Sequence, residues 1–457
     1  MYKIILAMRY LIKRRITYFA VLAVALCVFI VVVVMTVMAG LVSDFKQKSH
    51  NFVGDCVVGT ESLVGFAYYE DFVNILEKSG FVGGVSPVIK GYALVSPSWT
   101  DQSLGLEIMG IEPVRHSQTT GFGKTLHYRK GNVSKAFEQS FKPNLPGCVL
   151  GIDVSSRLGN ILAPVRDAEG GYSYSSRLGE MALSVSCVPL TARGAPANAG
   201  AGLIETKTFY SSDNSHSGLA RVDSSLVYLP FEWAQRLCGM GGSVKRASAI
   251  HIKFKPNVKL QTGCEKVASL WQKFKEEKAD ERQAYLLDTV TVQNWKDNRR
   301  SSIAPMEKEQ TVMTVMFAFV GITTVFIVFV VFYMIISHKS KDIGILKSIG
   351  ASNADIIELF SGFAFLVGLL GSCIGLFGGW LFLLKINQIE DWLFEHFKFQ
   401  LWDRTIYAIA DVPNQVSPKV LGVIVLSAII ACLVGALLPS RLAAKQKPVE
   451  ILQVNQL

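Results

Sequence analysis

Four apolar runs constrain this chain more than any other feature of its sequence. Residues 16–42, 311–337, 359–384 and 420–439 contain no charged residue. A helix of about 20 residues crosses the hydrocarbon core of a bilayer, and each run is long enough to do so. The first run is too long for the apolar part of a cleaved signal peptide, which covers about 7–15 residues. We therefore expect four membrane-spanning helices, of which the first is a retained anchor.

Charged residues are concentrated at the ends of these runs. Residues 1–15 contain five basic residues and no acid, and residues 440–457 contain three basic residues and one acid. The positive-inside rule then predicts that both terminal segments and the loop 338–358 are cytoplasmic, and that 43–310 and the loop 385–419 lie across the membrane. The net charge of +10 does not indicate nucleic-acid binding. Its surplus borders apolar runs and forms no basic face with interleaved aromatic residues.

The long segment 43–310 has the pattern of a large α+β domain between the first two spans. Short β-like runs alternate in it with amphipathic helical stretches. We expect strands at Val85–Val88, Leu104–Met109, Met181–Val188, Ser225–Leu229 and Ala249–Phe254, and helices at Tyr69–Lys78, Phe231–Cys238 and Gly263–Lys278. Residues 189–206 are rich in Pro, Gly and Ala without periodicity, which predicts an exposed loop or hairpin tip.

Five cysteines fall in this domain: Cys56, Cys148, Cys187, Cys238 and Cys264. They could form one or two disulfides in an oxidising compartment, and their spacing does not give the pairing. The sequence has no nucleophile–base pair or metal-ligand pattern of an enzyme. Gly121–Thr125 (GFGKT) resembles the end of a P-loop, but the motif needs a glycine where residue 118 is Gln. We interpret it as a surface turn and expect a non-catalytic chain that holds no metal and no cofactor.

The loop 338–358 predicts a short helix, a break and a second helix. Gly350 suits the left-handed residue that ends a helix, and Ser352 with Asp355 forms a capping box for the next one. The short helix has an apolar face of Ile343, Ile345, Leu346 and Ile349. Such a helix either docks in a groove of a cytoplasmic partner or lies on the membrane surface.

The third run contains small residues at four-residue spacing. Gly371, Gly375 and Gly379 would allow close approach of another helix in lipid. The sequence leaves open whether this helix belongs to the same chain or to a second copy.

Several motifs, taken in order, resemble one family. They are Leu6–Leu11 (LAMRYL), Gly83–Pro87 (GGVSP), Met109–Pro113 (MGIEP), Lys341–Lys347 (KDIGILK) and Ile349–Ser352 (IGAS). In this order and spacing the chain resembles the permeases of the MacB/FtsX class of ABC transporters. Within that class it is most similar to the lipoprotein-releasing permeases LolC and LolE.

The resemblance implies a membrane subunit without an ATPase site of its own. ATP and Mg²⁺ would be bound by a separate ATPase chain of the LolD or MacB type, and two permease chains would work together. The implied activity is extraction of lipoproteins from the bacterial inner membrane and their release to a periplasmic carrier. The alternatives are a MacB-like efflux or peptide export permease and an FtsX-like protein that signals to a cell-wall hydrolase.

The resemblance also assigns roles to particular residues. The helix that contacts the ATPase would contain Lys341, Asp342, Ile343, Gly344, Ile345, Leu346, Lys347, Ile349 and Gly350. The loop with Pro189, Arg193 and Pro196 would dock the carrier. Met35, Met38, Met313 and Met316, toward the outer ends of the first two spans, are candidates for contact with acyl chains, because Met adapts to irregular apolar ligands.

Overall fold

The computed structural model describes residues 15–99, 102–139, 145–158, 165–166, 172–173, 180–197, 203–338, 340–397 and 418–445. The described residues fall into two compact units. A helical unit contains those within 15–43, 305–397 and 418–445, and an α+β unit contains those within 44–304. Most of the predicted N-terminal segment, of the loop 385–419 and of the C-terminal tail lies outside the described residues.

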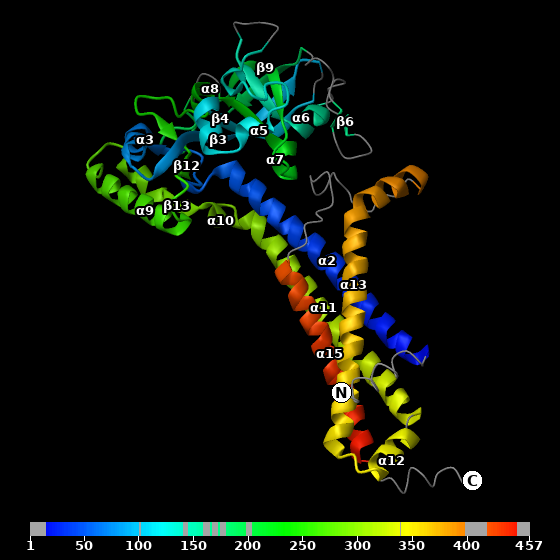
Figure 1. The fold of residues 1–457 in the computed structure, drawn as a ribbon. Helices are drawn as coiled ribbons and strands as arrows, with labels where there is room; N and C mark the ends of the chain where they lie inside the picture. The colour runs from blue at the N-terminus through cyan, green and yellow to red at the C-terminus, as the bar shows by residue number, and fades with distance from the viewer. Residues whose placement is uncertain are drawn as a thin grey trace. The chain divides into compact units, whose positions relative to one another are not determined.

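Long helices account for most of the helical unit. They are α2 (Arg15–Val53), α11 (Arg300–His338), α13 (Asn353–Phe397) and α15 (Pro418–Lys445), with the short α12 (Ser340–Ser348) between the second and third (Figure 1). Each of the four long helices is apolar and long enough to cross a membrane, which confirms the four predicted spans. A helix suits this environment because it satisfies its backbone hydrogen bonds internally.

The first two long helices extend beyond the apolar runs that predicted them. In α2 the helix continues through the mostly polar segment 44–53, where Lys48 and Asp44 form an ion pair of 2.8 Å one turn apart. In α11 it begins at Arg300, well before the uncharged run at 311. Hydropathy marks the part of a helix that suits lipid, and it does not mark where helical hydrogen bonding ends.

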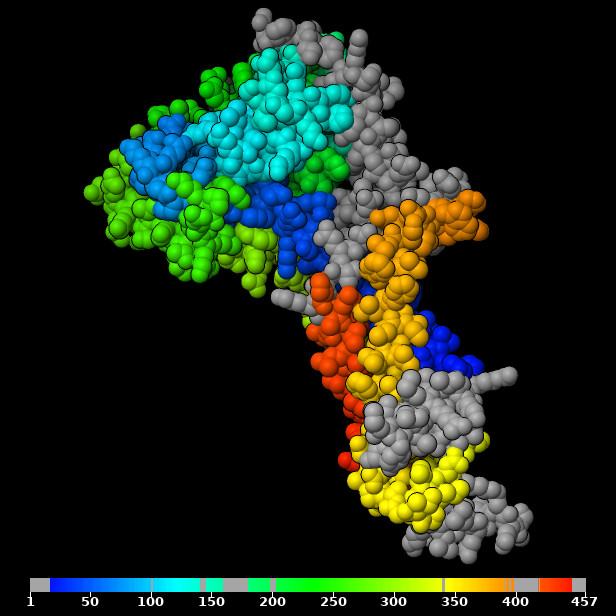
Figure 2. Space-filling model, in the orientation of Figure 1, coloured from blue at the N-terminus to red at the C-terminus, as the bar shows by residue number. Residues whose placement is uncertain are grey.

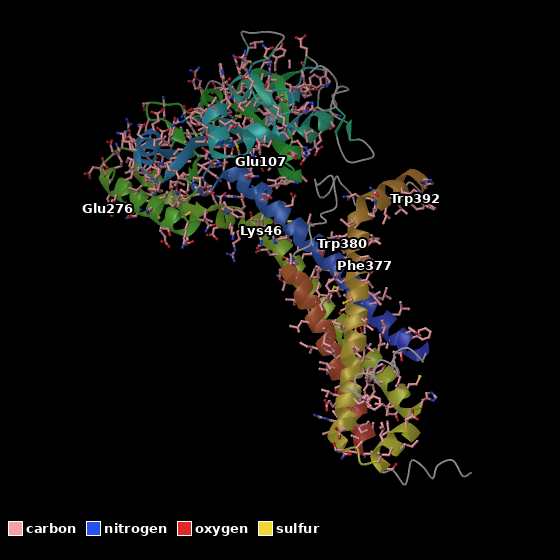
Figure 3. All side chains as sticks on the ribbon, in the orientation of Figure 1. Lys46, Glu107, Glu276, Phe377, Trp380 and Trp392 are labelled. Carbon is pink, nitrogen blue, oxygen red and sulfur yellow. The ribbon has the colours of Figure 1, made fainter. Side chains whose placement is uncertain are left out.

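The four helices differ in how much of their apolar surface is covered within the chain. In the most apolar stretch of α13, 50% is buried within the chain. In the corresponding stretch of α11, 17% is buried. Even α13 keeps large exposed side chains, among them Phe377, Trp380 and Trp392 (Figure 3). The least covered helix, α11, therefore has the most surface left for lipid or another molecule.

A mixed nine-stranded sheet forms the centre of the α+β unit, in the order β13-β1-β12-β3-β4-β10-β5-β9-β8. The β10–β4 and β5–β9 pairs are parallel, and the other neighbouring pairs are antiparallel. The long strand β3 also pairs with β8. The strands are β1 (Cys56–Gly59), β3 (Val82–Pro97), β4 (Leu104–Ile111), β5 (Gly147–Gly151), β8 (Ala182–Cys187), β9 (Glu205–Ser215), β10 (Leu226–Pro230), β12 (Ala249–Phe254) and β13 (Thr291–Asn294).

Two small sheets and several helices complete this unit. The small sheets pair β2 (Phe66–Ala67) with β11 (Arg246–Ala247) and β6 (Val165–Arg166) with β7 (Tyr172–Ser173). The helices are α3 (Tyr69–Lys78), α4 (Pro113–Thr119), α5 (Phe122–Thr125), η1 (Val133–Lys135), α6 (Ile152–Arg157), α7 (Ala220–Ser225), α8 (Phe231–Leu237), α9 (Leu260–Glu277), η2 (Ala284–Thr289) and α10 (Trp295–Asn298).

Both faces of the large sheet are buried. Ile89 and Leu150 belong to one core, together with Phe72 of α3 and Trp271 of α9, whose rings meet edge to face. Their sequence neighbours Val88 and Val149 belong to a second core, with Phe122 of α5. Successive residues of a strand point to opposite faces, so adjacent apolar residues supply the two cores.

Candidate functional site

The short helix α12 has the boundaries that its sequence predicted. Gly350 has a φ of +103°, and the amide of Ala351 donates to the carbonyl of Leu346, which closes the C-terminal end. At the start of α13 the Ser352 amide and hydroxyl donate to the Asp355 carboxylate, at 3.0 and 2.6 Å. The Asp355 amide donates back to the Ser352 hydroxyl at 3.2 Å. The predicted capping box is confirmed.

The apolar residues of α12 divide between two faces. Ile343 is buried in a cluster with residues of α11, α13 and α15, and Leu346 packs against that cluster. The Lys347 ammonium donates to the carbonyl of Ala444 on α15 at 2.6 Å. Ile345 and Ile349, one turn apart, are 49% and 80% exposed. The prediction of one apolar face was therefore wrong in part, because two of the four residues hold α12 to its own chain.

The remaining residues of the predicted coupling segment differ in their exposure. Gly344 is buried, and Asp342 is half-buried. Lys341 lies within the helix, and its side chain is outside the described residues. Ile345 and Ile349 are the large apolar side chains that α12 exposes. Figure 2 shows the yellow segment that contains α12 at the surface of the helical unit.

The three spaced glycines of α13 pack against α2 of the same chain. A Cβ at Gly371 would lie 2.8 Å from the side chain of Val24, and one at Gly375 would lie 2.4 Å from the carbonyl oxygen of Ala25. At Gly379 the nearest atom is a methyl of Val32, 3.1 Å away. Of the two readings that the sequence left open, packing within the chain is the one that the structure shows.

The four methionines do not form one described cluster. Met35, Met38 and Met313 are half-buried, and Met316 is 56% exposed. Contact with acyl chains remains a prediction for all four.

The segment predicted as a loop or hairpin tip forms a hairpin over its described residues. Leu190 bridges to Pro196, the Ala197 amide donates to the Pro189 carbonyl at 2.8 Å, and Gly194 turns with a φ of +81°. Arg193 is exposed at the tip. The predicted residues 198–202 lie outside the described part of the chain.

Buried polar groups hold the base of this hairpin. The Arg246 guanidinium donates to the carbonyls of Leu190 at 2.9 Å and Val64 at 2.7 Å. It also donates to the carbonyl of Gly239, so one cation joins three segments. The Leu190 amide in turn donates to the Cys238 carbonyl at 3.2 Å.

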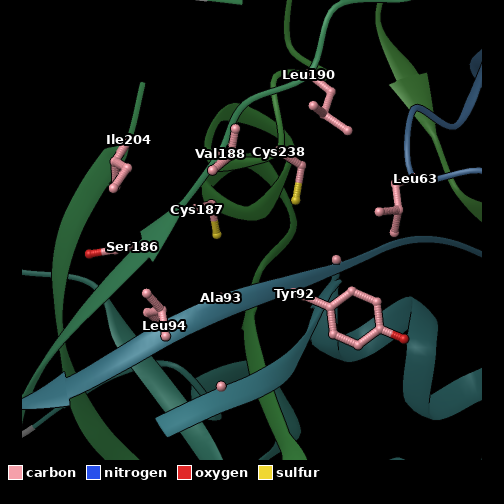
Figure 4. A pocket seen from close by; sticks show the side chains of 12 residues that line it. Leu63, Tyr92, Ala93, Leu94, Ser186, Cys187, Val188, Leu190, Ile204 and Cys238 are labelled. Carbon is pink, nitrogen blue, oxygen red and sulfur yellow. The ribbon is translucent and has the colours of Figure 1, made fainter. Parts of the chain in front are cut away.

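An apolar cavity of about 430 Å³ lies beside the hairpin (Figure 4). The residues that line it include Leu63, Tyr92, Leu94 and Val188, whose side chains are exposed. They also include Cys187 and Cys238, which are buried. Sequence reasoning missed this cavity, because its walls come from β3, β4, β8 and the residue after α8, which are far apart in the sequence and meet only in the fold.

The P-loop-like segment has no phosphate cradle. Residues Phe122–Thr125 form the single turn α5, whose Phe122 is buried in the core. A Cβ at Gly123 would lie 2.4 Å from the Ser117 hydroxyl, so this glycine is needed for packing. Among the described residues, no group of three or more His, Cys, Asp or Glu side chains could hold a metal ion.

Two buried carboxylates are committed to the fold. Asp213 accepts the backbone amides of His127, Tyr128, Arg129 and Asn214. Asp223 accepts the amides of Ser217 and Gly218, at 2.8 and 2.9 Å, and its burial raises its pKa to about 6. Both carboxylates therefore order the loops whose amides they accept.

Comparison with known proteins shows that most of the helical unit resembles a permease domain. Residues 314–448, which include most of α11 and all of α12, α13 and α15, match the family model described as FtsX-like permease C-terminal. The LolC transmembrane protein of the lipoprotein-releasing system of Xylella fastidiosa (strain 9a5c) is 25% identical over 162 residues, or 35% of this chain and 39% of that protein. LolC of Neisseria meningitidis serogroup B is 25% identical over 166 residues, 36% of this chain and 40% of that protein.

Residues 314–448 thus resemble an FtsX-like permease domain, and the chain is similar to permeases of the MacB/FtsX class. The chain spans about two fifths of the length of the LolC proteins that it matches. The periplasmic region of MacB from Actinobacillus actinomycetemcomitans is similar at a TM-score of 0.31 and 12% identity, over 55% of this chain and 94% of the MacB region. The FtsX-like match and the four long apolar helices point to an inner-membrane protein.

Proposed function

We propose that this permease uses ATP hydrolysis in a separate ATPase chain to extract lipoproteins from the inner membrane. The α+β unit lies in the periplasm in this proposal, and both termini are cytoplasmic. ATP and Mg²⁺ bind to the partner, which is of the LolD or MacB type. A second permease chain completes the transporter, and a periplasmic carrier receives the lipoprotein.

The observation that carries this proposal is the form of α12. It is a capped helix within the FtsX-like domain, and three long helices hold its inner face. Its outer face carries two exposed isoleucines at a spacing of four residues, which suits an apolar groove on a partner. A helix that only rested on lipid would need no attachment to α11, α13 and α15 at once.

In the proposed mechanism α12 transmits motion. Closure of two ATPase chains on ATP displaces α12, and its contacts with the ends of α11, α13 and α15 pass the displacement to the membrane helices. The first two spans then expel the lipid anchor toward the α+β unit. Met316 and the other large exposed apolar side chains of α11 supply the surface for acyl chains on this route.

The test is Ile349→Asp. A charge at this exposed position should leave the fold intact and weaken ATPase binding by about tenfold or more, since a desolvated unpaired carboxylate costs 1–3 kcal/mol or more at an interface. The measurements are retention of the ATPase during purification and permease-dependent ATP hydrolysis. Val114→Asp, at an exposed apolar residue of α4, is the matched control and should change neither.

Full ATPase retention by Ile349→Asp would contradict the role of α12. An outer-membrane channel or a cell-wall hydrolase in the purified complex, in place of a carrier, would favour efflux or signalling over lipoprotein release.

A further inference from the structure

Four of the five cysteines in the α+β unit lie in two contacting pairs. Cys56 is the first residue of β1 and Cys264 lies in the second turn of α9, and the two side chains are neighbours at the same core, where α9 packs against β1. Cys187 ends β8 and Cys238 follows α8, and the two side chains are neighbours in the same core and line the same cavity. These partners are far apart in sequence, so the fold alone brings them together.

The surroundings of each pair fix the partners' positions. Gly263, next to Cys264, packs directly against the ring of Phe254, so α9 lies close against the sheet at this point. At the other pair the backbones of Gly239 and Leu190 are in contact, and the Leu190 amide donates to the Cys238 carbonyl. Figure 4 shows both thiols of this second pair at the wall of the cavity.

The fifth cysteine has no thiol neighbour among the described residues. Cys148 is fully buried in β5, and burial raises the pKa of its thiol to about 12. It therefore stays protonated and unreactive, and it serves as an internal control for the other four.

We propose that Cys56–Cys264 and Cys187–Cys238 are two disulfide sites that close when this unit meets an oxidising compartment. The periplasmic position of the unit rests on the proposed function, whereas the pairing rests on the contacts alone. The reagent that the sites would take is a disulfide donor, meaning an oxidised dithiol protein or oxidised glutathione.

Each site would close by thiol–disulfide exchange. In the first pair Cys264 is the half-buried partner, and the neighbouring Cys56 thiol lowers its pKa, so its thiolate attacks the donor disulfide and releases one donor thiol. The Cys56 thiol then loses its proton to solvent, and its sulfur displaces the second donor thiol. Two protein thiols are oxidised, and the donor disulfide is reduced to two thiols.

The second pair is reached through the apolar cavity. Tyr92, Leu94 and Val188 line the cavity and are exposed, so a small donor can approach the two buried sulfurs. Closure of this bond would fix the base of the Pro189–Ala197 hairpin to the end of α8, beside the hydrogen bonds of Arg246. The first bond would fix β1, two residues after α2, to α9.

The experiment maps the thiols of the full-length chain in native membranes. Acid-quenched membranes are denatured and alkylated with N-ethylmaleimide, and unreduced peptides are identified by mass spectrometry. The expected result is two linked peptide pairs, Cys56–Cys264 and Cys187–Cys238, with Cys148 alkylated. Cys56→Ser should leave Cys264 alkylated without affecting the second bond, and Cys148→Ser should change neither bond.

A second arm treats the purified full-length chain with oxidised glutathione. Bonds that form only in this arm would support the pairing and would count against a periplasmic position of the unit. Alkylation of all five cysteines in both arms, or a bond that includes Cys148, would overturn the proposal. Loss of ATPase binding by the chain would overturn the proposed function and leave the disulfide result standing.

Discussion

Single residues in the α+β unit show how burial sets protonation. His116 is buried between sheet and helix, its Nδ1 lies 3.0 Å from the Ser86 hydroxyl, and its ring stacks at a tilt on His251. Burial lowers the pKa of His116 from 6.5 to about 3 and holds the pKa of His251 well below 6.5. Both imidazoles are neutral in the folded chain at pH values where the unfolded chain protonates them.

This burial predicts acid sensitivity of the α+β unit. Between pH 6.5 and 3 the unfolded state binds more protons at His116 than the folded state does, so stability falls as pH falls. Acidification from pH 6.5 to 5 should cost about 2 kcal/mol for this histidine. His116→Gln should lose that part of the pH slope, as measured by urea unfolding of the full chain at several pH values.

The comparison between variant and wild type removes the contribution of His116 together with its electrostatic effect on His251. Asp223, whose raised pKa gives the opposite slope between pH 3.8 and about 6, is present in both chains and cancels. Identical slopes in the two chains would mean that His116 is protonated in the fold.

At the scale of elements, small residues decide how helices approach each other. Gly371, Gly375 and Gly379 let α13 lie directly on α2, while Gly368 meets Cys432 of α15. Such contacts replace the hydrophobic effect as the source of helix association in lipid. The same helix has one glycine that faces open space, Gly362, which allows a matched comparison.

Gly375→Ala should destabilise the helical unit. The new methyl would lie 2.4 Å from the carbonyl oxygen of Ala25, so α2 and α13 must separate, at a cost of about 1–3 kcal/mol. Gly362→Ala, where no atom lies within 4 Å, should be neutral or slightly stabilising because Ala favours a helix. Thermal unfolding in detergent micelles measures both, and equal transition temperatures would contradict the packing argument.

Local patterns predicted many of these elements. α3 has the predicted bounds Tyr69–Lys78, and a strand lies at each of the five predicted β positions, although Met181, Val188 and Ser225 fall outside the strands. The capping box and the hairpin were also predictable, because Ser, Asp, Gly and Pro determine the backbone conformation of the few residues around them. The sequence could not name the neighbour of the glycine stripe, or the division of α12 into two faces, because both depend on helices far away in the chain.

The strand β9 shows a different limit. Its end, Ser211–Ser215, is polar and fully buried, so it lacks the apolar alternation that marks a strand. The Ser212 hydroxyl donates to the carbonyls of Ala136 and Cys148, and the Asp213 carboxylate accepts four backbone amides. Hydrogen bonds compensate for the burial, and hydropathy does not register them.

At the scale of the whole molecule, the hairpin at Pro189–Ala197 is the candidate contact for a soluble carrier. Arg193→Glu reverses an exposed charge at its tip and should reduce carrier crosslinking by about tenfold, the effect of 1.4 kcal/mol. Lys273→Glu, at an exposed position of α9, is the matched control. Equal crosslinking in both variants would remove the hairpin from the carrier interface.

The joint between α12 and α13 has a mechanical consequence. Only Ile349–Ser352 separate the two helices, and hydrogen bonds close both sides of this short connection. A displacement of α12 by a partner bound at Ile345 and Ile349 would therefore move α13 with it, because the short hydrogen-bonded connection resists bending. The same displacement would reach α15 through the hydrogen bond from the Lys347 ammonium, so that one small binding surface would move two membrane helices.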